Sequence, residues 1–362
     1  MKIWIDGYEA NTLQRLGSSQ VVYELIRHFE KIDHENDYTI LLPSSPLGDL
    51  PREREGFRYK ILKPKKLWTR IALPLALYTA KQKPDIFFSP THYIPRFSPV
   101  KRIVTIFDLS FLHFPEMFRR VDLWQLKNWT KFSALNADHI ITISNFSKQD
   151  IIKQYGVNKE KITVAYPGYD RENFKPSGKK PDNYIIFIGT LQPRKNLVRL
   201  MEAMARVPNL NLVIVGKTKG EGKEGWMYEE TLATPKRLGI EDRVKFLGFV
   251  PTEDLAGLIR GAQALIQPSL YEGFGIPVVE AMACAVPVLV SDVSSLPEVV
   301  GKAGLTFDPY SIDQIEQAIR TITTDKKLRA KYAKAALERS KGFSYDKMVR
   351  TLLKIFERVA FK

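Results

Sequence analysis

Residues 269–292, "SLYEGFGIPVVEAMACAVPVLVSD", hold two carboxylates eight positions apart, Glu272 and Glu280, in sequence that is otherwise uncharged until Asp292. A carboxylate accepts two hydrogen bonds at once, which suits neighbouring hydroxyls on a ribose or another sugar ring. The "GFG" segment between them lets backbone amides approach a ligand closely. The simpler alternative is that each carboxylate only stabilises a helix N-terminus.

A pair of cations, Arg194 and Lys195, lies in "IFIGTLQPRKNLVRLMEA". A predicted strand ends at Gly189, and the following loop brings the pair to the start of a helix at Asn196. Helix N-termini carry partial positive charge and free amide donors. Two cationic side chains at such a point predict a site for an anion with two phosphates, although an exposed pair of this kind is often only surface charge.

Short β-rich runs alternate with helical patterns along the whole chain. In the first half they cover residues 2–6, 38–42, 85–89, 102–107, 139–144 and 161–166, and in the second half 184–189, 211–216, 244–249, 264–269, 286–292 and 304–309. Most are apolar throughout, which is typical of parallel strands covered on both faces. The alternation predicts doubly wound α/β architecture.

A polar stretch rich in Pro, Gly and Lys, residues 167–183, divides the two halves and has the composition of a linker. We therefore expect two Rossmann-like lobes, residues 1–170 and 182–343, which suits a chain of 362 residues. Ligands of open parallel sheets bind beyond the carboxyl ends of the strands, so a cleft between the lobes is the expected site. An amphipathic helix follows over 344–362.

The net charge of +15 is concentrated in residues 52–102, which hold 13 Lys or Arg against 3 Asp or Glu. Such a region attracts nucleic acid, anionic lipid or phosphorylated substrates, or it only keeps the surface solvated. We expect no nucleic-acid partner, because the cations are not interleaved with exposed aromatics. A single cysteine, Cys284, favours a reducing compartment, and we expect a cytoplasmic protein.

Several common site motifs are missing from the sequence. It contains neither G-x-G-x-x-G nor a Walker loop, and its five histidines lack metal-ligand spacing. These absences argue against a dehydrogenase, a nucleoside triphosphatase and a zinc enzyme.

Together the motifs resemble those of the family-four retaining glycosyltransferases. "YEGFGIPVVE" matches the E-x7-E motif, and "GTLQPRKNL", about 80 residues earlier, matches the Arg-Lys element that grips the donor diphosphate. "TIFDLSFLHFPEMF", "ITISNFSKQDI" and "ITVAYPGYD" resemble the N-terminal lobe of mannosyltransferase-like members. The resemblance covers essentially the whole chain.

The resemblance implies a GT-B fold, with two Rossmann-like lobes facing a cleft, the first on the acceptor side and the second on the nucleotide-sugar side, and a last helix that crosses back to the first lobe. By carry-over, Arg194 and Lys195 bind the diphosphate, Glu280 accepts from the ribose hydroxyls and Glu272 lies against the sugar ring. The amides of Gly273, Phe274 and Gly275 lie nearby, and Gly17 belongs to a loop that closes on the phosphates. The glutamates are thereby expected to act apart from the cations.

One departure concerns Phe107-Asp108, where many relatives carry His-Asp. Phe107 offers no side-chain hydrogen bond, whereas Asp108 is retained and is expected to orient the acceptor hydroxyl. His113 and His92 are candidate substitutes for the missing histidine. The departure leaves open a catalytically weak or inactive protein that only binds a sugar or nucleotide.

The expected reaction is transfer of a hexose from a nucleotide diphosphate sugar to a glycan or glycolipid hydroxyl, with retention, by front-face attack. GDP-mannose is the favoured donor and UDP-glucose the next. We expect no metal or other cofactor, because Arg194 and Lys195 provide the positive charge that an Asp-x-Asp metal site would.

Residues 60–83 contain Lys and Arg on either side of an apolar segment with Trp68. This pattern predicts peripheral contact with anionic lipid at the inner face of the membrane. Pro74 and the continuous apolar run favour instead a lobe helix whose apolar face is core.

Overall fold

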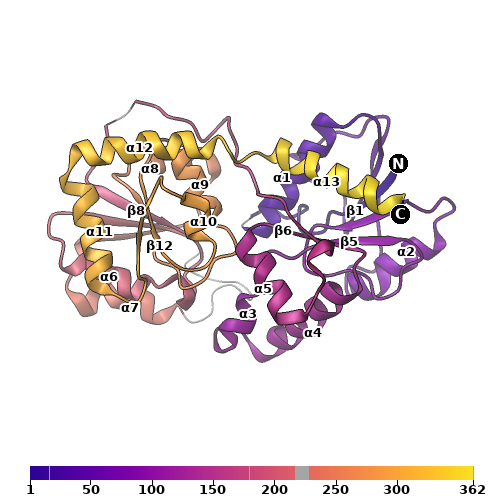
Figure 1. Cartoon of the computed structure of the whole chain (residues 1–362), viewed down its shortest axis with the longest axis horizontal. Helices are drawn as coiled ribbons and strands as arrows, with labels where there is room; N and C mark the ends of the chain where they lie inside the picture. The colour runs from indigo at the N-terminus through magenta and orange to yellow at the C-terminus, as the bar shows by residue number, and fades with distance from the viewer. Residues whose placement is uncertain (16, 179, 217–227, 362) are drawn as a thin grey trace. The chain divides into compact units, whose positions relative to one another are not determined.

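The computed structural model describes residues 1–15, 17–178, 180–216 and 228–361. The predicted loop before the first helix, the linker 167–183, the second lobe and the terminal segment 344–362 each include positions outside the described residues, namely Leu16, Lys179, 217–227 and Lys362. The chain divides into two compact units (Figure 1). Unit 1 comprises Met1–His113, Phe118–Gly168 and Ser344–Lys362, and unit 2 comprises Phe114–Met117 and Tyr169–Phe343.

Unit 1 is built on a sheet of seven parallel strands in the order β3-β2-β1-β4-β5-β6-β7. The strands are β1 Lys2–Asp6, β2 Asp37–Leu42, β3 Phe57–Ile61, β4 Ile86–Ser89, β5 Lys101–Thr105, β6 His139–Thr142 and β7 Ile162–Val164. In β1, Ile5 faces Ile40 of β2 on one side and Phe88 of β4 on the other. All three side chains are buried, as expected for a central strand covered on both faces.

The helices of unit 1 connect these strands and cover the sheet. They are α1 Ser18–Ile32, the π-helical segment η1 Trp68–Ala72, α2 Leu73–Thr79, α3 Ser110–His113, α4 Arg120–Asn136, α5 Asn145–Tyr155, η3 Lys159–Lys161 and α13 Tyr345–Ala360. The ring of Phe356 on α13 packs against two rings of the unit. Its centroid lies 5.8 Å from that of Phe29 on α1 and 5.2 Å from that of Phe88 on β4. The C-terminal helix is therefore part of the unit 1 core.

Unit 2 repeats the plan with six parallel strands in the order β10-β9-β8-β11-β12-β13. They are β8 Tyr184–Ile188, β9 Asn211–Val215, β10 Val244–Gly248, β11 Leu265–Gln267, β12 Val288–Ser291 and β13 Leu305–Phe307. The helical segments are η2 Pro115–Met117, η4 Pro193–Lys195, α6 Leu197–Ala205, α7 Glu229–Leu238, η5 Glu241–Arg243, α8 Thr252–Gly261, α9 Ile276–Ala283, α10 Leu296–Val300, α11 Ile312–Thr324 and α12 Lys326–Ser340. Leu200 of α6 and Ile319 of α11 share a core with Phe187 of β8.

The prediction of two doubly wound parallel-sheet lobes is confirmed. In each sheet the second and third strands are added to one side of the first strand, β1 or β8. The fourth strand, β4 or β11, pairs with the other side of that strand, and the later strands follow it outward. The sequence did not predict β3, an edge strand in which only Phe57 is fully buried and Arg58 and Lys60 alternate with it. An edge strand needs only one apolar face, so its pattern is weak.

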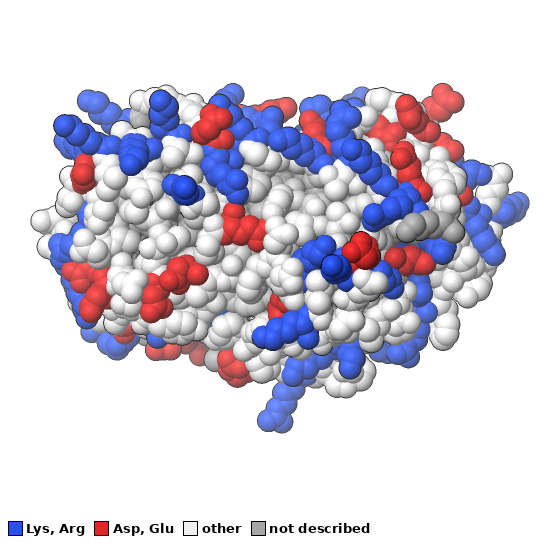
Figure 2. Space-filling model, in the orientation of Figure 1, with Lys and Arg blue, Asp and Glu red and all other residues white. Residues whose placement is uncertain are grey.

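Cations are spread widely over the surface. On the face drawn in Figure 2, Lys and Arg lie over much of the area with Asp and Glu among them. Within the described residues, we find no helix with the length and apolar character needed to cross a membrane.

Candidate functional site

The loop after β8 is fixed by Asn196, which begins α6 in a left-handed conformation (φ 62°). Its Nδ2 donates to the carbonyls of Pro268 and Pro309, at 3.0 and 2.7 Å. These carbonyls belong to the loops that follow β11 and β13. One side chain therefore joins three strand ends and holds the preceding η4, with Arg194 and Lys195, beside them.

The carboxylate of Glu272 is the centre of a buried polar network. Its Oε1 accepts from Lys195 Nζ at 2.5 Å and from Gln267 Nε2 and Ser269 Oγ, both at 2.8 Å. Its Oε2 lies 3.5 Å from Arg194 Nη1, which also donates to the Tyr271 carbonyl at 2.9 Å. Both cations and the first glutamate of the motif thus form one cluster at the carboxyl edge of the unit 2 sheet.

This arrangement corrects one expectation from the sequence, that the glutamates act apart from the cations. Burial on its own raises the pKa of Glu272, but the charges of Lys195 and Arg194 and the hydrogen bonds lower it to about 2. Glu272 is therefore an anion throughout the neutral range, and it holds the two cationic side chains in fixed positions. A fixed pair of cations beside a helix N-terminus is suited to binding a diphosphate.

The "GFG" segment is shaped by its glycines. Gly275 precedes α9 with φ 107°, and a Cβ there would meet Leu296 Cδ2 at 2.9 Å. The carbonyls of Glu272 and Phe274 accept from Ser295 Oγ at 2.8 and 3.2 Å, and Gly273 between them is buried. The loop is therefore held rigidly, as a ligand-binding backbone needs to be.

Glu280 lies in the second turn of α9 and is half-buried. Its charge acts on the thiol of Cys284, whose pKa is raised to about 12, chiefly by burial. Cys284 is thus an inert buried thiol. The predicted hydroxyl-binding role of Glu280 stays a prediction.

Three of the first-lobe candidates lie in unit 1. Gly17 precedes α1 with φ 56°, a conformation that favours glycine, and a Cβ there would meet nothing within 4 Å. Asp108, just beyond the end of β5, accepts from the Ser110 amide at 2.8 Å and so begins α3. His113 Nε2 lies 2.8 Å from Asp150 Oδ2 on α5. The predicted roles of Gly17 and Asp108 stay predictions.

His92 lies beside Phe107, the position where the sequence departs from the family that it resembles. Its ring centroid is 5.9 Å from that of Phe107, which is buried. Its Nδ1 is buried and has no hydrogen-bond partner among the described residues. Burial lowers the pKa of His92, while the nearby charge of Asp108 raises it. The lowered pKa favours the neutral imidazole near pH 7.

Sequence reasoning missed Gln267, Ser269 and Asn196. Gln267 could have been recognised from the sequence. It stands in the apolar run "ALIQPS", and a glutamine side chain needs a hydrogen-bond partner once such a strand is buried. Asn196 follows the Arg-Lys pair directly, but its αL conformation and distant partners are visible only in the fold.

Comparison with protein families supports the interpretation of both halves. Residues 170–339 match the family described as "Glycosyl transferases group 1". Residues 16–173 match the family described as "Glycosyltransferase Family 4". The two matches together span residues 16–339, which is most of both units.

Among curated proteins, an O-antigen chain mannosyltransferase B of Escherichia coli is 32% identical over 281 residues, which is 73% of this chain and 72% of the relative. A D-inositol 3-phosphate glycosyltransferase of Kribbella flavida is 30% identical, over 60% of this chain and 55% of the relative. Among solved structures, sucrose-phosphate synthase of Thermosynechococcus elongatus superposes with a TM-score of 0.81 at 19% identity, covering 99% of this chain and 98% of that one. The structure of Anabaena HepE in complex with UDP-glucose superposes with a TM-score of 0.76 at 19% identity, covering 99% of each chain.

Proposed function

This chain belongs to the group 1, family-four glycosyltransferases, and from that premise we propose that it moves a hexose from a nucleotide diphosphate sugar to an acceptor hydroxyl. The acceptor is a glycan or a glycolipid. The observation that carries the proposal is the buried cluster of Lys195, Arg194 and Glu272 at the carboxyl edge of the unit 2 sheet. Ligands of such sheets bind at this edge.

The donor diphosphate is assigned to Arg194 and Lys195. Glu272 and Asn196 hold the two cations in place before any ligand arrives, so little reorganisation is needed when negative charge develops on the leaving diphosphate. Their positive charge does the work of a divalent metal, so we propose a metal-independent reaction. Glu280 is assigned to the ribose hydroxyls, and the amides of Gly273, Phe274 and Gly275 to the sugar side.

Mannose is the favoured sugar and GDP-mannose the favoured donor. The support is the 32% identity to a protein named as an O-antigen chain mannosyltransferase. UDP-glucose is the second choice, because HepE, a structural neighbour, was solved in complex with that donor.

We propose retention by front-face attack. A double displacement would need a carboxylate nucleophile, and Glu272 is a poor one because its oxygens are engaged by Lys195, Gln267, Ser269 and Arg194 and its pKa is about 2. In the proposed step the acceptor oxygen bonds to the anomeric carbon as the bond to the departing phosphate oxygen breaks. That phosphate oxygen takes the acceptor proton, and Asp108 orients the acceptor.

Membrane contact is assigned to η1 and α2, which have two apolar faces. Trp68, Leu73 and Leu77 are buried in unit 1, as the core-helix alternative predicts. The opposite face, here called the exposed stripe, consists of Leu67 (54% exposed), Ile71 (43%), Leu75 (54%) and Tyr78 (54%). Exposed lysines flank it at positions 63, 65, 66, 81 and 83. An apolar stripe flanked by lysines favours peripheral contact with anionic lipid.

Donor turnover tests the proposal against a protein that only binds sugar or nucleotide. We expect transfer or slow hydrolysis of GDP-mannose, and we expect Lys195→Ala to lower kcat by about 10²–10³. Lys327→Ala, an exposed lysine on α12, serves as the control and should leave kcat unchanged. Binding of the nucleotide sugar without any turnover would favour the inactive alternative, whose support is Phe107.

A further inference from the structure

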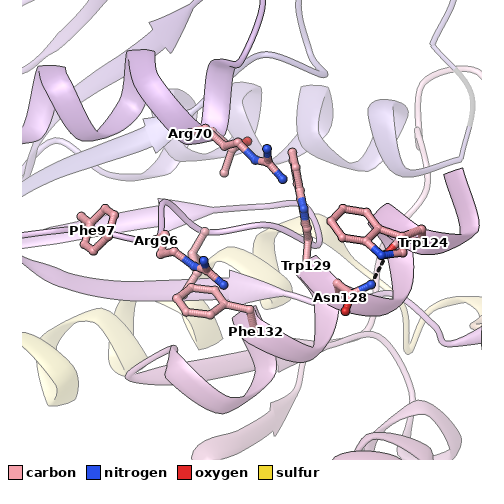
Figure 3. Close-up of a pocket in the computed structure, with 9 residues that line it drawn as sticks. Arg70, Arg96, Phe97, Trp124, Asn128, Trp129 and Phe132 are labelled. Atoms are coloured by element: carbon pink, nitrogen blue, oxygen red, sulfur yellow. Dashed lines mark hydrogen bonds between the residues drawn. The ribbon is translucent and has the colours of Figure 1, made fainter. Parts of the chain in front are cut away.

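A pocket of about 490 Å³ opens in unit 1 between η1, the loop after β4 and helix α4 (Figure 3). The residues that matter in its lining are Arg70, Arg96, Phe97, Trp124, Trp129 and Phe132. None of its nine lining residues is acidic. Its size falls within the range of small-molecule sites, roughly 300–1,000 Å³.

Two guanidinium groups in this pocket are stacked on aromatic rings. Arg70 Cζ lies 4.3 Å from the ring centroid of Trp129, and Arg96 Cζ lies 4.9 Å from that of Phe132 (Figure 3). Within the described part of the chain, neither guanidinium forms an ion pair or a side-chain hydrogen bond. The aromatic rings fix the direction of both arginines while leaving their N–H donors available, which indicates an anionic ligand.

The lining distinguishes between classes of anion. Arg70 and Arg96 stack on the two inner rings, Trp129 and Phe132, and their N–H donors suit an anion better than a neutral sugar ring. A free phosphate would fill only a small part of the volume. The rim is apolar, with Phe97 65% exposed and Trp124 59% exposed. Exposed tryptophan next to cations is typical of protein surfaces at the headgroup level of a membrane.

We propose that this pocket binds the phosphate of a membrane lipid, with the phosphate between Arg70 and Arg96 and the apolar chain leaving past Trp124. Arg70 belongs to η1, whose next residue, Ile71, is part of the exposed stripe. Contact with the bilayer and capture of one lipid phosphate therefore use the same short segment. The inference rests on the proposed function in one respect, since it identifies the lipid phosphate as the carrier of the acceptor.

Binding of dodecyl phosphate, below its critical micelle concentration, tests the proposal directly through the fluorescence of Trp124 and Trp129. We expect saturable binding to the wild type and at least about a tenfold weaker affinity in the double variant Arg70→Gln, Arg96→Gln, because charge-assisted hydrogen bonds are lost. The matched control is Arg27→Gln, Arg58→Gln, which removes two arginines elsewhere in unit 1, one of them also stacked on an aromatic ring. This control should bind as the wild type does.

Two further probes separate the sources of the signal. Inorganic phosphate that bound as tightly as dodecyl phosphate would overturn the assignment to a lipid. Dodecyl maltoside that bound as tightly would overturn the assignment to an anion, and so would unchanged affinity in the double variant. Nucleotide binding by the same variants, and their slow hydrolysis of the donor without an acceptor, do not need this pocket and should stay intact. Failure of this proposal is therefore distinct from failure of the proposed function.

Discussion

Lys195 Nζ and Glu272 Oε1 form a hydrogen-bonded ion pair across 77 positions of sequence, at 2.5 Å, with both side chains about 10% exposed. Breaking a buried pair by removing one partner leaves an uncompensated charge. The carboxylate is therefore both the structural support of the cation pair and the group whose loss should be felt most in folding and in donor binding.

Acid should destabilise unit 2 through Glu272. Its pKa is about 2 in the folded protein against an ordinary value of 4.5, so its contribution is fully present above 4.5 and is lost as the pH falls toward 2. The shift corresponds to a contribution on the order of 3 kcal/mol. The free energy of unfolding, measured in denaturant across this range, should fall in the wild type and less steeply in Glu272→Gln. Glu253→Gln, an exposed control on α8, should follow the wild type. If the free energy of unfolding fell equally steeply with pH in all three proteins, Glu272 would not be the source of the acid sensitivity.

Sequence predicted the fold well because most strands are buried on both faces, so their apolar runs are continuous. The edge strand β3 was missed because Arg58 and Lys60 interrupt its pattern. Sequence also singled out Arg194, Lys195 and Glu272, but it did not predict that they touch. That contact depends on β8 and β11 being neighbours in the sheet, a relation that local pattern does not contain.

Gly275 should not tolerate a side chain. Alanine at this position would keep φ near 107° and place its Cβ 2.9 Å from Leu296 Cδ2, so we expect Gly275→Ala to lower the free energy of unfolding by about 1–3 kcal/mol. Gly257→Ala is the matched control, because Gly257 lies within α8 with nothing within 4 Å of the added Cβ. That change should stabilise by about 0.5–1 kcal/mol. Similar effects of the two changes on thermal or denaturant unfolding would contradict the assigned role of Gly275.

Protonation of His92 should produce an acidic limb in the pH profile of kcat/KM. Burial holds its pKa below the ordinary 6.5, against the opposing charge of Asp108, and its Nδ1 has no hydrogen-bond partner within the described part of the chain. We expect kcat/KM to be full above this pKa and to fall as the pH drops through it. His92→Gln should lower the rate and flatten the limb, whereas His34→Gln, at an exposed position, should change neither. If the acidic limb were unchanged in His92→Gln, it would have to come from another titrating group.

The exposed stripe should bind anionic vesicles. Co-sedimentation with phosphatidylcholine vesicles should require added phosphatidylglycerol. Leu75→Glu should weaken binding about tenfold or more, because it removes an exposed apolar side chain from the lipid contact and adds a charge of the same sign as the lipid. Leu232→Glu makes the same change on α7 of unit 2 and should have no effect. Identical sedimentation of both variants, or no binding to either vesicle, would rule out the stripe as a membrane contact.

The most direct measurement of the central claim compares nucleotides with and without their phosphates. Calorimetric titration of GDP and guanosine, and of UDP and uridine, should be carried out on the wild type and on Arg194→Ala, Lys195→Ala. If the two cations grip the donor diphosphate, the double variant loses about 100-fold or more in affinity for the diphosphate and little for the nucleoside. Equal affinity of both proteins for the diphosphate, or an equal loss for nucleoside and diphosphate, would contradict the account.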